Sequence, residues 1–263
     1  MDDDAFFFEK QSSFRDHGLE GYEAYFEHCE ASSPKVVLEA TPSYLYQRTA
    51  PEVLSQLDPT PNVIFVLRKP SERAYSHFHY FRDTKARIDR RVDFREFVHL
   101  ELREDPRLSE FTKGPARRVV ANSRYVEYLP IWFERFPRER LHLFLFEELT
   151  QDPRRFLKVI AGRLGLNSTF FEEYEFKRSN TTFQIRRARI HRLRREIGRH
   201  LPPRVRRRLK MATGTAYARV NVDSGHVPRT RDEADVVAEL DQYFEPFNER
   251  LAELTGLDLA AWR

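Results

Sequence analysis

One short apolar run, followed within three residues by a proline, constrains the fold of this chain more than any other feature. Residues 63–67, Val-Ile-Phe-Val-Leu, predict a buried parallel strand, and Pro70 favours the start of a helix, expected over 71–83. Arg68 then lies at the carboxyl end of the strand, and Ser76 lies in the second turn of the helix. A guanidinium at such a strand end, beside a hydroxyl and a helix start, suits a phosphate group. On spacing alone, a structural ion pair for Arg68 and a surface position for Ser76 remain the alternatives.

Strands and helices are expected to alternate along the rest of the chain. Apolar runs and helical spacing predict strands over 35–38 and 141–146, helices over 18–29, 51–57, 94–102 and 123–135, and a loop over 107–118. Such alternation predicts a parallel sheet with right-handed crossover connections. No internal repeat or low-complexity linker interrupts it, so we expect a single domain over residues 1–263.

Cap residues locate the ends of two further helices. Asp152 is a favourable N-cap with a proline directly after it, and Gly165 is expected to end the helix that they begin. The last helical segment, around residues 236–244, is predicted to break at Pro246 and to stop at Gly256.

Composition bounds the class of protein. With 263 residues, 40% of them apolar and 13% aromatic, the chain is long enough for a substantial core. No apolar run approaches the ~18 residues that a transmembrane helix needs. Three aspartates near the start oppose a signal peptide, and the single Cys29 favours a reducing, cytoplasmic setting without an internal disulfide. Histidine and cysteine spacing indicates no metal site.

Positive charge is concentrated in residues 186–210. This segment holds eleven arginines and one lysine against one glutamate, a net charge of +11, so the rest of the chain, at an overall +4, carries −7. Apolar residues at helical spacing over 190–201 predict an amphipathic basic helix. It suits an anionic partner, such as an acidic glycan or a lipid headgroup, and a solvated helix face is the alternative. The local charge does not predict specific nucleic-acid binding.

Several further motifs occur in the order found in one enzyme family. They are LEATPSYLY at 38–46, VIFVLRKPSERAYS at 63–76, YLPIWFERFP at 128–137, LFLFEELTQDP at 143–153 with LGL at 164–166, and YFEPFNERL at 243–251 with LDLAAW at 257–262. In this order, over nearly the whole chain, they resemble the sulfotransferases that use 3′-phosphoadenosine 5′-phosphosulfate (PAPS), in particular the heparan-sulfate type.

The resemblance implies a fold, a reaction and site residues. The fold is an α/β, P-loop-NTPase-like parallel sheet flanked by helices. The reaction moves a sulfuryl group from PAPS to a hydroxyl or amine of a small-molecule or glycan acceptor, without a metal. Glu39 is then the base, partly desolvated after strand 35–38, although Ala40 stands where family members often have lysine. Arg68 and Ser76 bind the 3′-phosphate. Without the resemblance, a charge at a strand edge is the better interpretation of Glu39.

The segment 221–229 falls where the family has a basic, glycine-containing loop that closes over the nucleotide. Gly225 matches the loop glycine, while His226 and Val227 replace residues that are usually basic. We therefore expect nucleotide contacts from Gly225 and His226, with an ordinary surface loop as the alternative.

One family element has no counterpart in the sequence. Members begin with a strand and a lysine-containing loop, rich in glycine and threonine, that cradles the 5′-phosphosulfate. Here residues 1–8 (MDDDAFFF) resemble the region after that loop, and none of the nine glycines rebuilds it. We expect a misplaced start codon to account for the missing strand, loop and lysine. The alternative is a catalytically inactive member that binds a nucleotide or a polyanion.

Overall fold

The chain forms two compact units in the computed structural model, which describes residues 36–176, 184–185, 222–223 and 228–263. The described part of the first unit comprises residues 36–67 and 126–144, and the second comprises 68–125 with the described residues from 145 onward. The helix expected over 18–29 and the basic helix over 190–201 lie outside the described residues. The single-domain interpretation stays a prediction.

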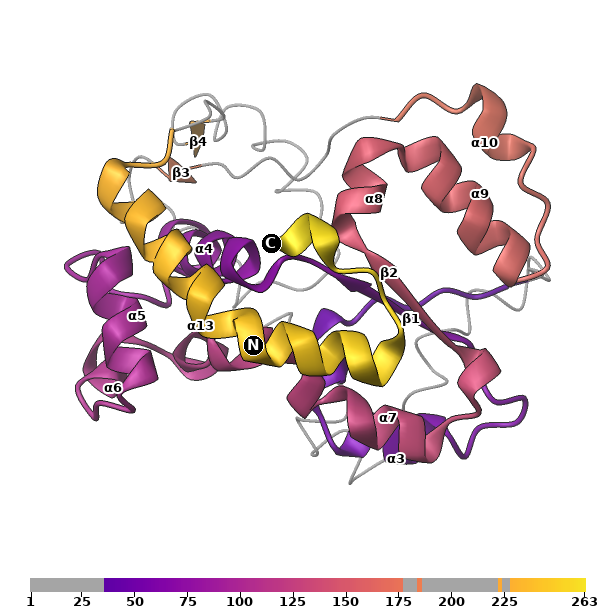
Figure 1. The fold of residues 1–263 in the computed structure, drawn as a ribbon, viewed down its shortest axis with the longest axis horizontal. Coiled ribbons are helices and arrows are strands. Elements are labelled where there is room, and N and C mark those ends of the chain that lie inside the picture. Colours follow the sequence, from indigo (N-terminus) through magenta and orange to yellow (C-terminus); the bar gives the residue numbers. More distant parts are fainter. Residues whose placement is uncertain (1–35, 177–183, 186–221, 224–227) are drawn as a thin grey trace, which may run out of the picture. The chain divides into compact units, whose positions relative to one another are not determined.

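The first unit contains a two-stranded parallel sheet covered by helices. Strands β1 (Val63–Leu67) and β2 (Leu141–Leu145) are neighbours, as expected for an α/β fold (Figure 1). Helix α3 (Thr49–Leu54) contacts α7 (Leu129–Arg135). Trp132 of α7 is fully buried, and its ring lies edge-on to Phe65 of β1 with centroids 5.0 Å apart. The aromatic contact thus packs α7 against the sheet.

The prediction of a strand over 35–38 is wrong for residues 36–38, the part of it that the structure describes. Residues 36–40 adopt neither helix nor strand. Val36, Val37 and Leu38 are exposed, Leu38 by 77%. Apolar residues favour a strand only where a neighbouring strand and a packed face support them, and the described part of the chain provides no ladder partner here.

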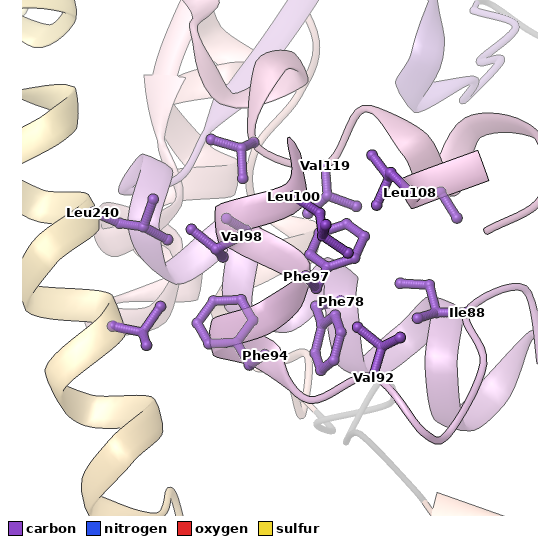
Figure 2. Packing of buried hydrophobic residues seen from close by; sticks show 14 of the residues in the cluster. Phe78, Ile88, Val92, Phe94, Phe97, Val98, Leu100, Leu108, Val119 and Leu240 are labelled. Carbon is purple, nitrogen blue, oxygen red and sulfur yellow. The ribbon is translucent and has the colours of Figure 1, made fainter. Parts of the chain in front are cut away.

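The second unit is built around three helices that share one core. Helix α4 (Pro70–His79) runs on into a π-helical turn (Tyr80–Thr84), and both α4 and α5 (Phe94–Leu102) pack against the long α13 (Arg231–Thr255) (Figure 1). Figure 2 shows the rings of Phe78, Phe94 and Phe97 together, with Leu240 reaching in from α13. The centroid of Phe78 lies 5.2 Å from that of Phe94 and 5.1 Å from that of Phe97. This core fixes the position of α4, which carries the candidate site residues.

Short elements complete the described structure. They are α6 (Leu108–Phe111), α8 (Phe146–Gln151), α9 (Pro153–Arg163), α10 (Phe170–Glu173), the antiparallel pair β3 (Gln184–Ile185) and β4 (Val222–Asp223), and 3₁₀ turns at Pro42–Tyr46, Gly114–Arg117, Ala121–Ser123, Tyr125–Glu127, Arg138–Arg140 and Ala260–Trp262.

Two expected elements differ in detail from those observed. The loop over 107–118 contains α6 and a 3₁₀ turn. The helix over 123–135 is divided into a 3₁₀ turn and α7, because Pro130 in the first turn of α7 has no N–H to continue a helix from upstream.

The predicted break at Pro246 is wrong, since α13 continues through it to Thr255. Leu240 and Phe244 before the proline and Leu251 after it are all buried. Their packing outweighs the one helical hydrogen bond that a proline removes.

The predicted helix ends are confirmed. The Asp152 carboxylate accepts a hydrogen bond from the backbone N–H of Arg155 at 2.9 Å, which caps α9. Gly165 and Gly256 follow α9 and α13 with φ of +66° and +73°, a conformation that glycine adopts without strain.

Neither a membrane span nor a metal cluster is formed by the described residues. No helix in those ranges combines the length and apolar character needed to cross a bilayer. Nor do three His, Cys, Asp or Glu side chains of those ranges come together as metal ligands.

Candidate functional site

Backbone contacts hold Arg68 at the junction of β1 and α4. The Tyr125 hydroxyl donates a hydrogen bond to the Arg68 carbonyl oxygen at 2.9 Å and accepts one from the Arg68 N–H at 3.4 Å. The next N–H, that of Lys69, donates to a carboxylate oxygen of Glu147 at 3.0 Å. Tyr125 itself is buried. The predicted position of Arg68 at the strand end is therefore confirmed, and its backbone is fixed by partners from distant parts of the sequence.

The Arg68 guanidinium remains partly accessible. Its Nη2 atom lies 3.3 Å from Oε2 of Glu72, four residues later, and its Cζ atom lies 5.3 Å from the ring centroid of Phe146. The side chain is 33% exposed. An arginine held in this way retains donors that an incoming anion can reach.

A second guanidinium reaches the same carboxylate. Nη2 of Arg229 lies 2.9 Å from each oxygen of Glu72, and the Arg229 Cζ atom stands 4.2 Å from the ring centroid of Tyr75. Both Arg229 and Glu72 are about one-third accessible, at 28% and 30%. No local sequence pattern predicts this pairing, although Arg229 ends the segment 221–229, for which the sequence predicts nucleotide contacts.

Ser76 lies on the same side of α4 as Glu72. The two residues are four positions apart, which makes them neighbours on the helix surface. Ser76 is partly buried, and its hydroxyl makes no hydrogen bond within the described residues. Arg68 and Ser76 are thus brought to the two sides of Glu72, while Gly225 and His226 lie outside the described residues.

Arg73, on the same helix, points elsewhere and is structural. Its Nη1 atom donates to the carbonyl oxygen of Val119 at 3.2 Å and to the hydroxyl of Ser123 at 2.9 Å. The residue is buried. It ties α4 to the segment that leads to Tyr125, and so supports the backbone position of Arg68.

Glu39 belongs to the first unit and is exposed. The Thr41 hydroxyl donates a hydrogen bond to its carboxylate, which restrains the side chain. The expected setting of a partly desolvated carboxylate after strand 35–38 is not found, because residues 36–38 form no strand. Its role as a base stays a prediction.

His77 adjoins the candidate anion site and is held neutral. Burial lowers the pKa of its imidazole from 6.5 to about 3, helped by the charges of Arg73 and, more weakly, Arg68. The ring is packed near Tyr80 and Phe81. The neutral imidazole therefore adds no positive charge to the site near pH 7.

The neutral His77 makes stability depend on pH. The unfolded chain binds more protons than the folded chain between pH 6.5 and 3, so the free energy of unfolding falls as the pH drops through this range. At pH 5 the loss is about 2 kcal/mol. We expect His77→Phe to reduce the difference in unfolding free energy between pH 7 and pH 5 by about this amount, measured by urea unfolding.

A matched control separates this effect from other titrations. Burial raises the pKa of Glu101 to about 7, so it titrates in the same range, but it does so in both proteins and cancels in the comparison. His99→Phe, at a more exposed histidine of α5, serves as the control. The same pH dependence in wild type and His77→Phe would contradict the assignment.

Comparison with known proteins assigns the chain to a family. Residues 9–195 match the family model described as a sulfotransferase domain. The chain is 24% identical over 227 residues to human heparan sulfate glucosamine 3-O-sulfotransferase 6, covering 85% of this chain and 56% of that protein. It is 27% identical over 156 residues to the bifunctional heparan sulfate N-deacetylase/N-sulfotransferase 1 of Caenorhabditis elegans, covering 59% of this chain and 18% of that protein. The chain thus spans about half the length of the 3-O-sulfotransferases that it matches.

A solved structure agrees with the fold. The crystal structure of a sulfotransferase from Alicyclobacillus acidocaldarius superposes with a TM-score of 0.51 at 19% identity, over 90% of this chain and 74% of that one. The expected α/β, P-loop-like fold is confirmed. With the family model matching most of its length, this chain belongs to the PAPS-dependent sulfotransferase family.

Proposed function

We propose that this protein transfers a sulfuryl group from PAPS to a hydroxyl or amine of a glycan acceptor. The observation that carries the proposal is Arg68 at the end of β1, with Ser76 on α4, whose hydroxyl makes no hydrogen bond within the described residues, in a chain of this family. Relatives named as heparan sulfate glucosamine 3-O-sulfotransferases and N-sulfotransferases support an amino-sugar polymer as the acceptor.

The residues of the site fit the 3′-phosphate of the cofactor. A planar guanidinium makes two parallel, charge-assisted hydrogen bonds to a phosphate, and Arg68 has accessible donors for them. The Ser76 hydroxyl is a further donor. When bound, PAPS supplies an activated sulfuryl group. Arg68 and Ser76 would hold the nucleotide end and so fix the orientation in which the acceptor meets that group.

Glu39 would take the proton from the attacking acceptor. An acceptor hydroxyl must lose its proton as its oxygen forms the new bond, and a carboxylate within hydrogen-bond reach accepts it. The hydrogen bond from Thr41 supports this role because it restrains the Glu39 carboxylate through one oxygen, and within the described residues the other oxygen accepts no hydrogen bond. Exposure of Glu39 leaves room for a bulky glycan.

An assay of sulfuryl transfer to a glycan tests the proposed function. The intact protein would be incubated with PAPS radiolabelled in its sulfuryl group and with either heparosan, an unsulfated and N-acetylated polymer that offers hydroxyls, or its N-deacetylated form, which also offers amines. We expect label in at least one polymer and none without protein. A folded protein that binds the nucleotide but labels neither polymer would contradict the proposal and favour the catalytically inactive alternative.

A further inference from the structure

The Glu72 carboxylate occupies the position of an anion between two arginines. Arg229 contacts both of its oxygens at 2.9 Å, and Arg68 contacts one of them at 3.3 Å. The three groups carry a net charge of +1. Two guanidiniums that approach one point repel each other, and an anion between them offsets that repulsion.

The arginine at 229 is held firmly by its surroundings. Its guanidinium stacks on Tyr75, and the next residue, Thr230, caps α13. The Thr230 hydroxyl accepts from the Glu233 N–H at 3.2 Å, and the Glu233 carboxylate accepts from the Thr230 N–H at 3.0 Å. This reciprocal capping fixes the backbone directly after Arg229. The guanidinium is therefore held on the Glu72 carboxylate that Arg68 also contacts, a form of preorganisation.

The ion pairs within this cluster are of the kind that a ligand can displace. All three side chains are between 28% and 33% exposed. Ion pairs at such sites contribute about 0–1 kcal/mol each, because water screens them. A phosphate dianion carries more charge than a carboxylate and accepts more hydrogen bonds, so it competes well for the same donors.

We propose that Arg229 is the second guanidinium of the 3′-phosphate site, and that Glu72 is an internal counter-anion that competes with the phosphate for both arginines. The inference rests on the proposed function, since it takes the 3′-phosphate of the nucleotide as the ligand. In the absence of nucleotide, Glu72 holds the two arginines together. When the phosphate binds, Glu72 gives up its contacts, and the cost of this exchange lowers the affinity of the site.

A purely structural role for Glu72 predicts the opposite effect of substitution. If Glu72 only ties α4 to the residue before α13, then Glu72→Gln loosens the site and weakens binding. If Glu72 competes with the phosphate, the same change removes the competitor and leaves both positive charges available. The sign of the change in affinity therefore distinguishes the two roles.

The experiment is calorimetric titration with PAP, the desulfated product of PAPS, and with adenosine 5′-phosphate, which lacks the 3′-phosphate. We expect Glu72→Gln to bind PAP about tenfold more tightly than wild type, and Arg229→Ala to bind it about tenfold more weakly. Affinity for adenosine 5′-phosphate should change little in either variant. The matched control is Glu239→Gln. Glu239 lies on α13 and its carboxylate pairs with Arg95 of α5, so this change should leave both affinities unchanged.

The outcomes separate the inference from the function on which it rests. Wild-type protein that binds PAP, with Glu72→Gln equal or weaker, overturns the competitor role. Unchanged PAP binding by folded Arg229→Ala overturns the second-guanidinium role. Wild-type protein that fails to bind PAP overturns the proposed function, and this inference with it. Urea unfolding of each variant establishes that the proteins compared are folded.

Discussion

Glu39→Gln is expected to slow sulfuryl transfer by about two to four orders of magnitude while leaving the affinity for PAP unchanged. Glutamine keeps the shape of the side chain, and its carbonyl oxygen still accepts the hydrogen bond from Thr41. It cannot take a proton from the acceptor. The measurement is the initial rate of label transfer to the glycan by the intact protein, at saturating PAPS, with PAP binding followed by calorimetry.

Glu52→Gln provides the matched control for this substitution. Glu52 is an exposed glutamate of α3 in the same unit, and its change to glutamine should leave the transfer rate within about twofold of wild type. If Glu39→Gln retained most of the wild-type rate, Glu39 would not be the base. A fall in rate matched by a fall in PAP affinity would instead indicate a structural role.

Arg68→Ala is expected to weaken PAP binding at least about a hundredfold. Charge-assisted hydrogen bonds are worth about 1.5–3 kcal/mol each, and a bidentate contact contributes two of them. Calorimetric titration would measure the loss, and affinity for adenosine 5′-phosphate should change much less. Part of the PAP affinity should return in Arg68→Lys, which keeps the charge but not the planar fork.

The control for Arg68→Ala is Arg95→Ala. Arg95 is 31% exposed, close to the 33% of Arg68, and it also pairs with carboxylates, those of Asp232 and Glu239. Equal PAP affinities in the two variants would contradict the assignment of Arg68 to the phosphate. Circular dichroism of both would show whether they fold.

Local patterns in the sequence were sufficient to predict the elements that position Arg68. The apolar run over 63–67 has clear boundaries, and the proline at 70 marks the next helix, so β1 and the start of α4 were located to within a residue. Position along these two elements is all that is needed to place Arg68 at a strand end and Ser76 two turns beyond it. The motif order then indicated the family.

Contacts between distant segments were beyond the reach of such patterns. Arg229 and Glu72 are 157 residues apart in sequence and meet only because α13 packs on α4. No periodicity encodes that pairing, since it depends on how two helices dock. The continuation of α13 through Pro246 also depends on tertiary packing. Buried residues on both sides of the proline stabilise the helix by more than the proline destabilises it locally.

The segment before Glu39 shows where a local pattern misleads. Val36 and Val37 have high strand propensity and Leu38 extends the apolar run, yet all three are exposed and form no strand. A strand requires hydrogen-bond partners that propensity does not supply. The setting of Glu39 was therefore predicted less well than that of Arg68, whose strand pairs with β2.

The central claim is that this chain recognises the 3′-phosphate of the sulfuryl donor, and calorimetric titration of the wild-type protein with PAP and with adenosine 5′-phosphate tests it most directly. The account predicts a dissociation constant for PAP in the micromolar range and an affinity for adenosine 5′-phosphate at least about tenfold lower. Equal affinity for the two nucleotides, or no binding of PAP by the folded protein, would contradict it.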